Sequence, residues 1–219
     1  MRINSFTKFV SIPKLLYVSI RLCGLSRGIL LPILVRYNTK LVDLNGKLEG
    51  NGKLDFGFGG IGIFDNKHER CILEIKGGGK VVVKGYSHWG PRCRFSVGKM
   101  GTLTIGDNVA NSAACTIIAM KNVNIGDDTI ISWDTLIMDS DFHKVKNLFD
   151  GNTSNLTNSI TIESNCWLGA RCVILKGTFV HKGSIIGANT TCTKDYIEDN
   201  VLIVGTPGLV KKRGIMPMP

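Results

Sequence analysis

The sequence predicts a mainly β protein in which short strands stack into a solenoid. Aliphatic residues recur every six positions, from Ile162 through Leu168, Ile174, Val180 and Ile186, and a small residue follows four places after each. In a helix these aliphatic residues would lie about 240° apart and form no single face, whereas alternation along a strand keeps them on one side. Strands this short cannot bury a face alone, so they must stack on their neighbours.

The period extends upstream with less regularity. It is clear from Ile105 and, after a slip of two residues, from Ile125, but before residue 100 it is faint and Ser87 does not fit. Glycine often takes the second position of a hexad, as at Gly169 and Gly187, where we expect a corner that needs freedom in φ.

The domain organisation follows from the extent of the period. We expect a basic arm over residues 1–40, a solenoid domain over 41–210 that is regular from about 97, and a C-terminal tail over 211–219. The glycine-rich stretch 46–64 should form early, irregular coils.

One polar segment breaks the period between Ile137 and Ile162. A solenoid expels such an insertion as a loop on one face, and insertions of this kind often carry function. We therefore expect an extruded loop near residues 138–159, which contains His143.

The arm at 1–40 is basic and apolar. It holds seven Lys and Arg residues and no Asp or Glu, so seven of the ten net positive charges lie there. Such segments suit a membrane surface, and packing of a helix or extended arm across the end of the solenoid is equally expected. A nucleic-acid binder would carry its basic stripe on the folded body, so we expect no nucleic acid.

The longest apolar run, residues 29–35, contains Pro32 and is far short of the ~20 residues that span a bilayer. With no small-residue cleavage site, we expect neither a transmembrane helix nor a signal peptide.

Seven cysteines are an odd number, and they include no CxxC pair. We interpret them as buried thiols in a reducing compartment, which predicts a cytoplasmic protein, at most peripheral at the cytoplasmic face of the membrane. A zinc site would need clustered thiolates, so we expect no metal.

Three segments resemble a known family. ISWDTLIMDSDFH lies at residues 131–143, CWLGARCVILKG at 166–177, and IIGANTTCTKD at 185–195, followed by GTPGLVKK at 205–212. In this order they are similar to the hexapeptide-repeat acyltransferases, and more narrowly to the O-acetyltransferases of bacterial surface polysaccharides. The resemblance covers roughly residues 100–213.

The resemblance implies a left-handed parallel β-helix, a homotrimer, and acetyl-CoA in the groove between adjacent subunits. It further implies direct, acetyl-CoA-dependent transfer to a sugar hydroxyl of a capsule, O-antigen or exopolysaccharide. His143 matches the family's general base, and a neutral imidazole can indeed take the proton of a hydroxyl nucleophile. Asp141, in preference to Asp139, is expected to orient the ring.

The resemblance also assigns residues to the cofactor groove. A lysine near the C-terminus suits the CoA phosphates, because its ammonium is a compact point charge. The matching positions are Trp167, Ala170, Ala188, Thr193, Lys194 and Lys212.

Other readings remain open. N-acetylation of an amino sugar or nucleotide sugar could use the same base and donor, and a catalytically inactive solenoid scaffold would keep the prism alone. A zinc-dependent carbonic anhydrase needs three converging histidines, whereas His68, His88 and His181 are isolated in the sequence. Trp133 and Trp89 could stack on an acceptor sugar, although a tryptophan that caps a coil is the commoner situation.

Overall fold

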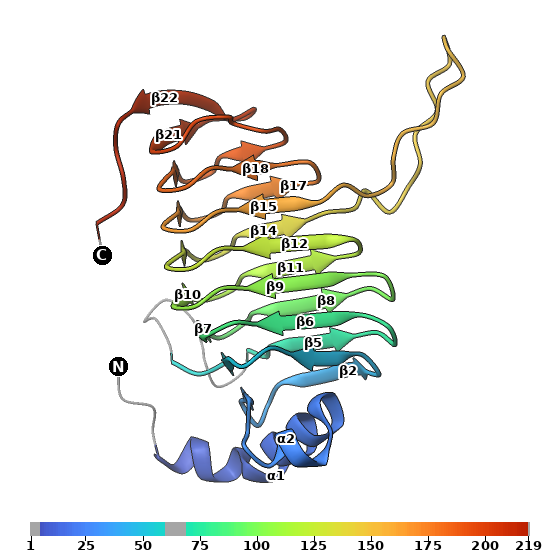
Figure 1. The fold of residues 1–219 in the computed structure, drawn as a ribbon, viewed down its shortest axis with the longest axis vertical. Coiled ribbons are helices and arrows are strands. Elements are labelled where there is room, and N and C mark those ends of the chain that lie inside the picture. The colour runs from blue at the N-terminus through green and yellow to red at the C-terminus, as the bar shows by residue number, and fades with distance from the viewer. Residues whose placement is uncertain (1–4, 60–68, 219) are drawn as a thin grey trace.

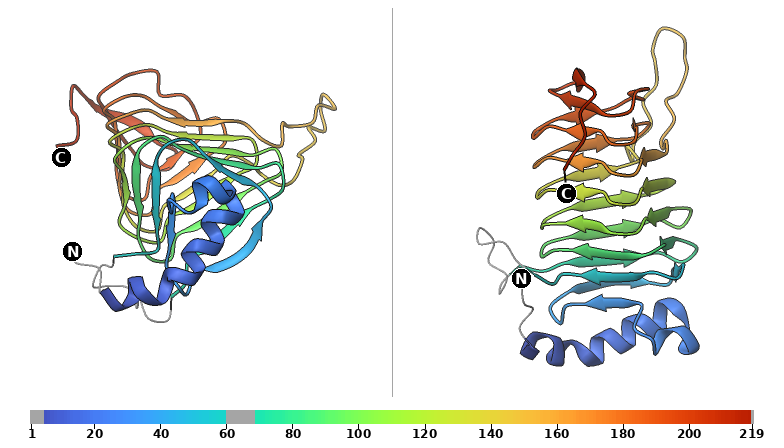
Figure 2. Two further views of the ribbon diagram at one scale, coloured as in Figure 1. Left: turned by 60° about the horizontal axis from the view of Figure 1, so that its bottom comes forward. Right: turned by 60° about the vertical axis from the view of Figure 1, so that its left-hand side comes forward.

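The computed structural model describes residues 5–59 and 69–218, and its body is a triangular prism (Figures 1 and 2). Within these residues three sheets of parallel strands form the faces, and the chain visits each face in turn. The fold is a left-handed parallel β-helix, as the repeat and the resemblance predict.

We name the faces sheets A, B and C. Sheet A contains β1 (Ile33–Val35), β4 (Lys53–Phe56), β7 (Tyr86–Trp89), β10 (Val109–Asn111), β13 (Ile130–Ile131), β16 (Trp167–Leu168), β19 (Ile185–Ile186), β21 (Val201–Val204) and β22 (Leu209–Arg213), which runs antiparallel to β21. Sheet B contains β2 (Lys40–Leu44), β5 (Ile72–Ile75), β8 (Arg94–Val97), β11 (Thr116–Ala119), β14 (Leu136–Met138), β17 (Val173–Leu175) and β20 (Thr191–Cys192). Sheet C contains β3 (Lys47–Glu49), β6 (Lys80–Val83), β9 (Thr102–Ile105), β12 (Asn122–Ile125), β15 (Ile160–Ile162) and β18 (Phe179–Val180).

The hexad aliphatics fill the inside of the prism. All the positions that predict the solenoid from Ile162 onward are buried. Leu168 lies beside Ile186 and Ile174 beside Cys192 on the next coil, so one coil takes three hexads. Each short strand thus buries its apolar side chain against the coils above and below.

The glycines at second hexad positions allow close stacking, so the expectation that they supply freedom in φ is wrong. Neither Gly169 nor Gly187 has a positive φ. A Cβ on Gly169 would lie 2.7 Å from the backbone nitrogen of Ala188, and one on Gly187 would meet a side chain at 2.5 Å. The left-handed corner conformations belong instead to residues such as Asn165 and Asn189, with φ of 59° and 57°, a region that asparagine tolerates.

The solenoid begins before the expected boundary at residue 41. Strand β1 pairs with β4 in sheet A, so the first coil starts at Ile33. Strands β3 and β4 lie in the glycine-rich stretch and confirm coils there, while residues 60–64 lie outside the described residues. Ser87 occupies an inward, fully buried position of β7, so the period continues through it with a polar residue. Strand β22 extends into the expected tail, as far as Arg213.

A helical cap covers the N-terminal end of the prism (Figure 2). Helix α1 (Ser5–Cys23) buries Leu15, Val18 and Leu22 against the first coil, and the short helix α2 (Leu25–Gly28) follows it. The Lys14 ammonium donates to the carbonyls of Tyr37 and Thr39 at 2.6 and 2.8 Å. The basic arm is therefore partly helical, as expected, and it packs across the end of the solenoid. Among the described helices, none is long and apolar enough to cross a membrane.

The cysteines are free thiols. All except the partly exposed Cys23 are buried in the prism, in agreement with the expectation from the sequence. Burial raises the pKa of Cys71 to about 12 and the pKa of both Cys166 and Cys172 to about 11. These thiols therefore stay protonated near neutral pH and pack as small apolar residues.

Candidate active site

The extruded loop leaves the prism between β14 and β15, at the corner that joins sheet B to sheet C (Figure 1). Asp139 holds its root: the buried carboxylate accepts hydrogen bonds from the backbone N–H groups of Met120, Lys121 and Asn122 at 2.7, 2.8 and 2.8 Å. Antiparallel bridges of Ser140 to Thr157 and of Lys146 to Thr153 make the loop a narrow two-stranded arm.

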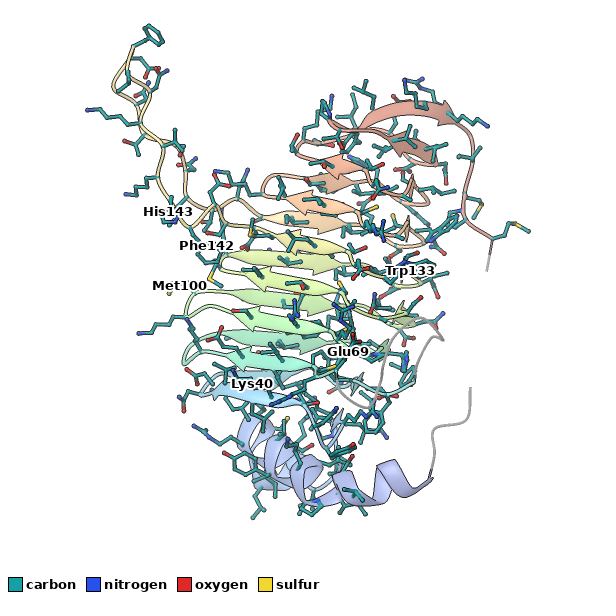
Figure 3. All side chains as sticks on the ribbon, turned by 180° about the vertical axis from the view of Figure 1, so that it is seen from behind. Lys40, Glu69, Met100, Trp133, Phe142 and His143 are labelled. Carbon is teal, nitrogen blue, oxygen red and sulfur yellow. The ribbon has the colours of Figure 1, made fainter. Side chains whose placement is uncertain are left out.

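His143 lies on this arm, close to the prism (Figure 3). The preceding residue, Phe142, has a φ of 59°, and its N–H donates to the Ser140 hydroxyl at 3.1 Å. His143 itself is exposed, and in the described part of the chain no hydrogen bond or ion pair joins its imidazole to another residue. The ring is thus open to an incoming group.

The two neighbouring aspartates do not orient this ring. Asp139 is committed to the loop root, and the Asp141 carboxylate lies 2.5 Å from the Lys176 ammonium. The expected Asp141–His143 contact is therefore not present in the chain. The reason is topological: Lys176 follows β17, one coil above the strand from which the loop departs, and it also donates to the carbonyl of Asn155.

Trp167 lies on the outer face of sheet A. Its strand pairs with β13 and β19, so Ile130 and Ile185 flank it on that face, and its Nε1–H donates to the Ser132 hydroxyl at 3.2 Å. Trp167 keeps 42% of its surface exposed. Together with the tail residues 216–218, these side chains line an apolar groove of about 490 Å³.

Lys212 lies on β22, the last strand of the same sheet. It pairs with Leu202 of β21, which in turn pairs with Ile185. The lysine is exposed, three strand spacings or roughly 14 Å from Trp167. An ammonium and an indole therefore lie three strands apart on one face.

Ala170 and Ala188 stack at the corner between sheets A and B. The N–H of Asn189 donates to the Ala170 carbonyl, and the N–H of Arg171 donates to the Trp133 carbonyl, both at 2.9 Å. Trp133 thus lies one coil below Ala170 and is partly exposed at this corner. Trp89 is fully buried against Phe95 in the core, so it does not reach any acceptor.

Thr193 and Lys194 lie at the other edge of sheet B. They follow β20, and the Lys194 carbonyl accepts from the N–H of Phe179 in sheet C at 3.2 Å. They therefore share the corner of the extruded loop, two coils above its root. The Lys194 ammonium lies 5.8 Å from the centre of the Tyr196 ring, a distance at which a cation–π attraction operates.

Sheet B thus divides the predicted site residues into two groups. His143, Asp141, Thr193 and Lys194 lie at its edge with sheet C, whereas Ala170 and Ala188 lie at its edge with sheet A. Figure 3 shows this separation, with His143 at one side of the prism and Trp133 at the other. A single chain does not bring the two groups together.

Two further histidines, His181 and His88, contact acidic side chains. The Nε2 of His181 lies 2.8 Å from Asp195, its Nδ1 lies 3.8 Å from both Glu163 and Asp199, and its ring stacks on Phe179. The pKa of Asp195 is lowered, first by the hydrogen bond that its carboxylate accepts from the backbone N–H of Ile197 and second by the hydrogen bond with the His181 imidazole.

His88 lies 3.2 Å from the buried carboxylate of Asp55. Neither pair assembles three histidines, and His68 lies outside the described residues.

Lys176 and Ser132 were not found from the sequence. A positional signal exists for both: each directly follows a strand at a corner that already carries a predicted residue. Aligning successive coils by the repeat places Lys176 one coil above the start of the loop and Ser132 one coil below Gly169.

We compared the chain with known protein families and with proteins of known function. No family model matches the sequence. A galactoside O-acetyltransferase of Lactococcus lactis is 36% identical over 104 residues, which are 44% of this chain and 50% of the relative. A putative lipopolysaccharide biosynthesis O-acetyl transferase, WbbJ, of Escherichia coli is 26% identical over 121 residues, 52% of this chain and 61% of the relative. The chain thus spans about half to three fifths of the length of these relatives.

Solved structures share the fold. The polySia-specific acetyltransferase NeuO has a TM-score of 0.58 at 23% identity, covering 83% of this chain and 82% of its own. The polysialic acid O-acetyltransferase OatWY has a TM-score of 0.51 at 18% identity, covering 85% and 87%. Fold, repeat and loop define a left-handed β-helix of the hexapeptide-repeat class. In sequence, the chain is similar to sugar O-acetyltransferases over about half of its length.

Proposed function

We propose that this protein is an acetyl-CoA-dependent O-acetyltransferase that modifies a sugar hydroxyl during the synthesis of a bacterial surface polysaccharide, such as a capsule, O-antigen or exopolysaccharide. The observation that carries the proposal is the exposed imidazole of His143, on an arm held at its root by Asp139. The sugar O-acetyltransferases among the relatives support the same reaction.

The chemistry is a direct transfer. The acceptor hydroxyl is a weak nucleophile, and His143 takes its proton as the oxygen attacks the thioester carbonyl carbon. The tetrahedral intermediate then collapses, the C–S bond breaks, and the proton passes from the imidazolium to the departing CoA thiolate. A base of this kind contributes about 10²–10⁴-fold to the rate.

The donor would lie along the face that carries Trp167. Ala170 and Ala188 are small residues at a stacked corner, so a pantetheine chain can pass close to the backbone there. Lys212, exposed at the far end of that face, would attract the CoA phosphates. Thr193 and Lys194 would contact the donor from the opposite edge of sheet B.

A homotrimer would bring the two groups of residues together. In a ring of three prisms, the loop of one copy can reach the corner of sheets A and B in its neighbour. The exposed tip of the arm supports this arrangement, because Leu148 and Phe149 are 89% and 102% exposed and lack the cover that apolar side chains usually have. The acceptor hydroxyl would then meet His143 and the thioester at the interface.

The protein would act at the cytoplasmic face of the membrane, where it would meet a lipid-linked acceptor. The basic composition of residues 1–40 supports this placement.

The experiment is acetyl transfer by the purified protein to the de-O-acetylated surface glycan of its host, read by mass spectrometry. We expect one acetyl group to be added per modified repeat unit, with release of one CoA thiol per acetyl group. Mild alkali should remove that group, because it cleaves an ester and spares an amide. An alkali-stable product would instead establish N-acetylation, and no product with any acceptor would favour the inactive scaffold.

A further inference from the structure

Helix α1 is apolar on both of its faces. Leu15, Val18 and Leu22 face the first coil of the prism and are buried. Ile12 and Leu16 project away from this buried face, and both are exposed. Exposed apolar side chains that gather on one helix face often mark an interaction surface, and this outer face of the cap has no partner within the described residues.

The segment after α1 adds to the same unpartnered surface. Leu25, Ile29 and Leu30 are 69%, 58% and 76% exposed. Gly28 between them packs against the backbone of Ile20, where a Cβ would lie 2.5 Å from the Ile20 Cα, so this segment is held tightly on α1. The outer apolar residues of the cap are thus presented by a fixed framework.

The charge of this region indicates the partner. Seven Lys and Arg residues and no acidic residue occur before Asp43. A second copy of the chain would bring the same positive charge to the interface, which disfavours pairing of two caps. An anionic lipid surface complements the charge and also accepts the apolar side chains.

We propose that the cap is a membrane-docking surface that inserts Ile12, Leu16, Leu25, Ile29 and Leu30 among the headgroups of anionic phospholipids. The axis of the prism then stands upright on the bilayer. In the proposed trimer, cyclic symmetry with the three axes parallel would place all three caps on one side, where they bind the same surface together.

This orientation fixes the height of the acceptor, an extension that rests on the proposed function. The loop leaves β14, four strand spacings above β2 in sheet B, which is roughly 19 Å. The cap helix adds about 10 Å. His143 would therefore act on a sugar held well above the headgroups, and a glycan of several sugar units on its lipid carrier would reach it where the lipid-proximal sugar would not.

The test is flotation of the full chain with vesicles. We expect binding to mixed phosphatidylglycerol–phosphatidylethanolamine vesicles, weaker binding at high salt, and little binding to phosphatidylcholine vesicles. The triple variant Leu16→Ser, Ile29→Ser, Leu30→Ser should lose about tenfold or more of its binding, because three apolar side chains no longer leave water. A matched variant, Met100→Ser with Ile197→Ser, removes two highly exposed apolar side chains elsewhere and should bind as the wild type does.

Several outcomes would overturn the proposal. Failure of the wild type to float with anionic vesicles would do so, as would undiminished flotation of a triple variant that melts at the wild-type temperature. Concentration-dependent pairing of caps, abolished by the triple variant and without vesicle binding, would assign the surface to a second copy instead. His143→Ala should float normally, and the triple variant should still acetylate a soluble acceptor, so failure of the docking surface and failure of the proposed function remain distinguishable.

Discussion

Asp139 and Asp141 are two positions apart and have different roles. The Asp139 carboxylate is buried and accepts three backbone N–H bonds, so it is structural. Asp141 is near the surface and pairs with Lys176. An exposed pair of this kind contributes little to stability, whereas a buried carboxylate that satisfies several donors contributes much.

Replacement of these two acids should therefore give unequal losses. Asp139→Asn turns an amide N–H₂ toward donors and should lower the free energy of unfolding by about 2–4 kcal/mol. Asp141→Asn should change it by less than about 1 kcal/mol. Urea unfolding of both variants measures the difference, and equal losses would contradict the assignment of Asp139 to the loop root.

For single residues, the sequence predicts the position in the fold better than the side-chain contacts. The broken period located His143 in a loop, and the resemblance singled out Trp167, which the structure places on an outer face. The ion pair of Asp141 with Lys176 could not be foreseen, because the residues are 35 positions apart and an insertion without a repeat lies between them. The six-residue period was faint at Ser87 because a polar residue occupies this inward position in place of an aliphatic one.

Among the elements, the corners determine how closely coils stack. A Cβ on Gly126 would lie 2.5 Å from the backbone nitrogen of Ser164 on the next coil, so glycine is required there for space. Asn165 on that coil supplies the left-handed conformation, with a φ of 59°. Aliphatic spacing predicted the strands from residue 105 onward, but spacing alone does not distinguish a glycine that allows contact from one that allows a positive φ.

Two substitutions separate these roles. Gly126→Ala should destabilise the protein by about 1–3 kcal/mol, because the backbone of the neighbouring coil must move. Asn165→Gly should change stability by less than about 1 kcal/mol, because glycine adopts the same φ readily. Thermal unfolding of the two variants is the measurement, and an equal or larger loss for Asn165→Gly would contradict the stacking account.

For the whole molecule, the distribution of the site residues supports the proposed trimer. The His143 imidazole lies at the corner of sheets B and C, whereas Trp167 lies on sheet A, and the extruded loop ends in exposed apolar residues. The N-terminal cap was predicted as a basic arm, but its second, outward apolar face became evident only once burial showed which residues the prism covers.

The arm tip provides the test of assembly. Leu148→Ser with Phe149→Ser should weaken the trimer and lower acetyl transfer together, while the melting temperature of the monomer fold stays unchanged because both residues are exposed. Met100→Ser, exposed at the same corner of the prism, is the matched control. Sedimentation velocity measures the assembly, and a wild-type protein that remains monomeric at all concentrations would exclude the shared site.

Catalysis by His143 is tested most sharply by the turnover of acetyl-CoA by His143→Ala in the presence of the acceptor glycan. Because His143 is exposed and has no partner in the described chain, this variant should fold and melt as the wild type does. We predict that its kcat falls by about 10²–10⁴-fold, whereas Lys144→Ala, one position further along the arm, keeps its rate. An unchanged kcat in His143→Ala would contradict the account, because the imidazole would then not be the base.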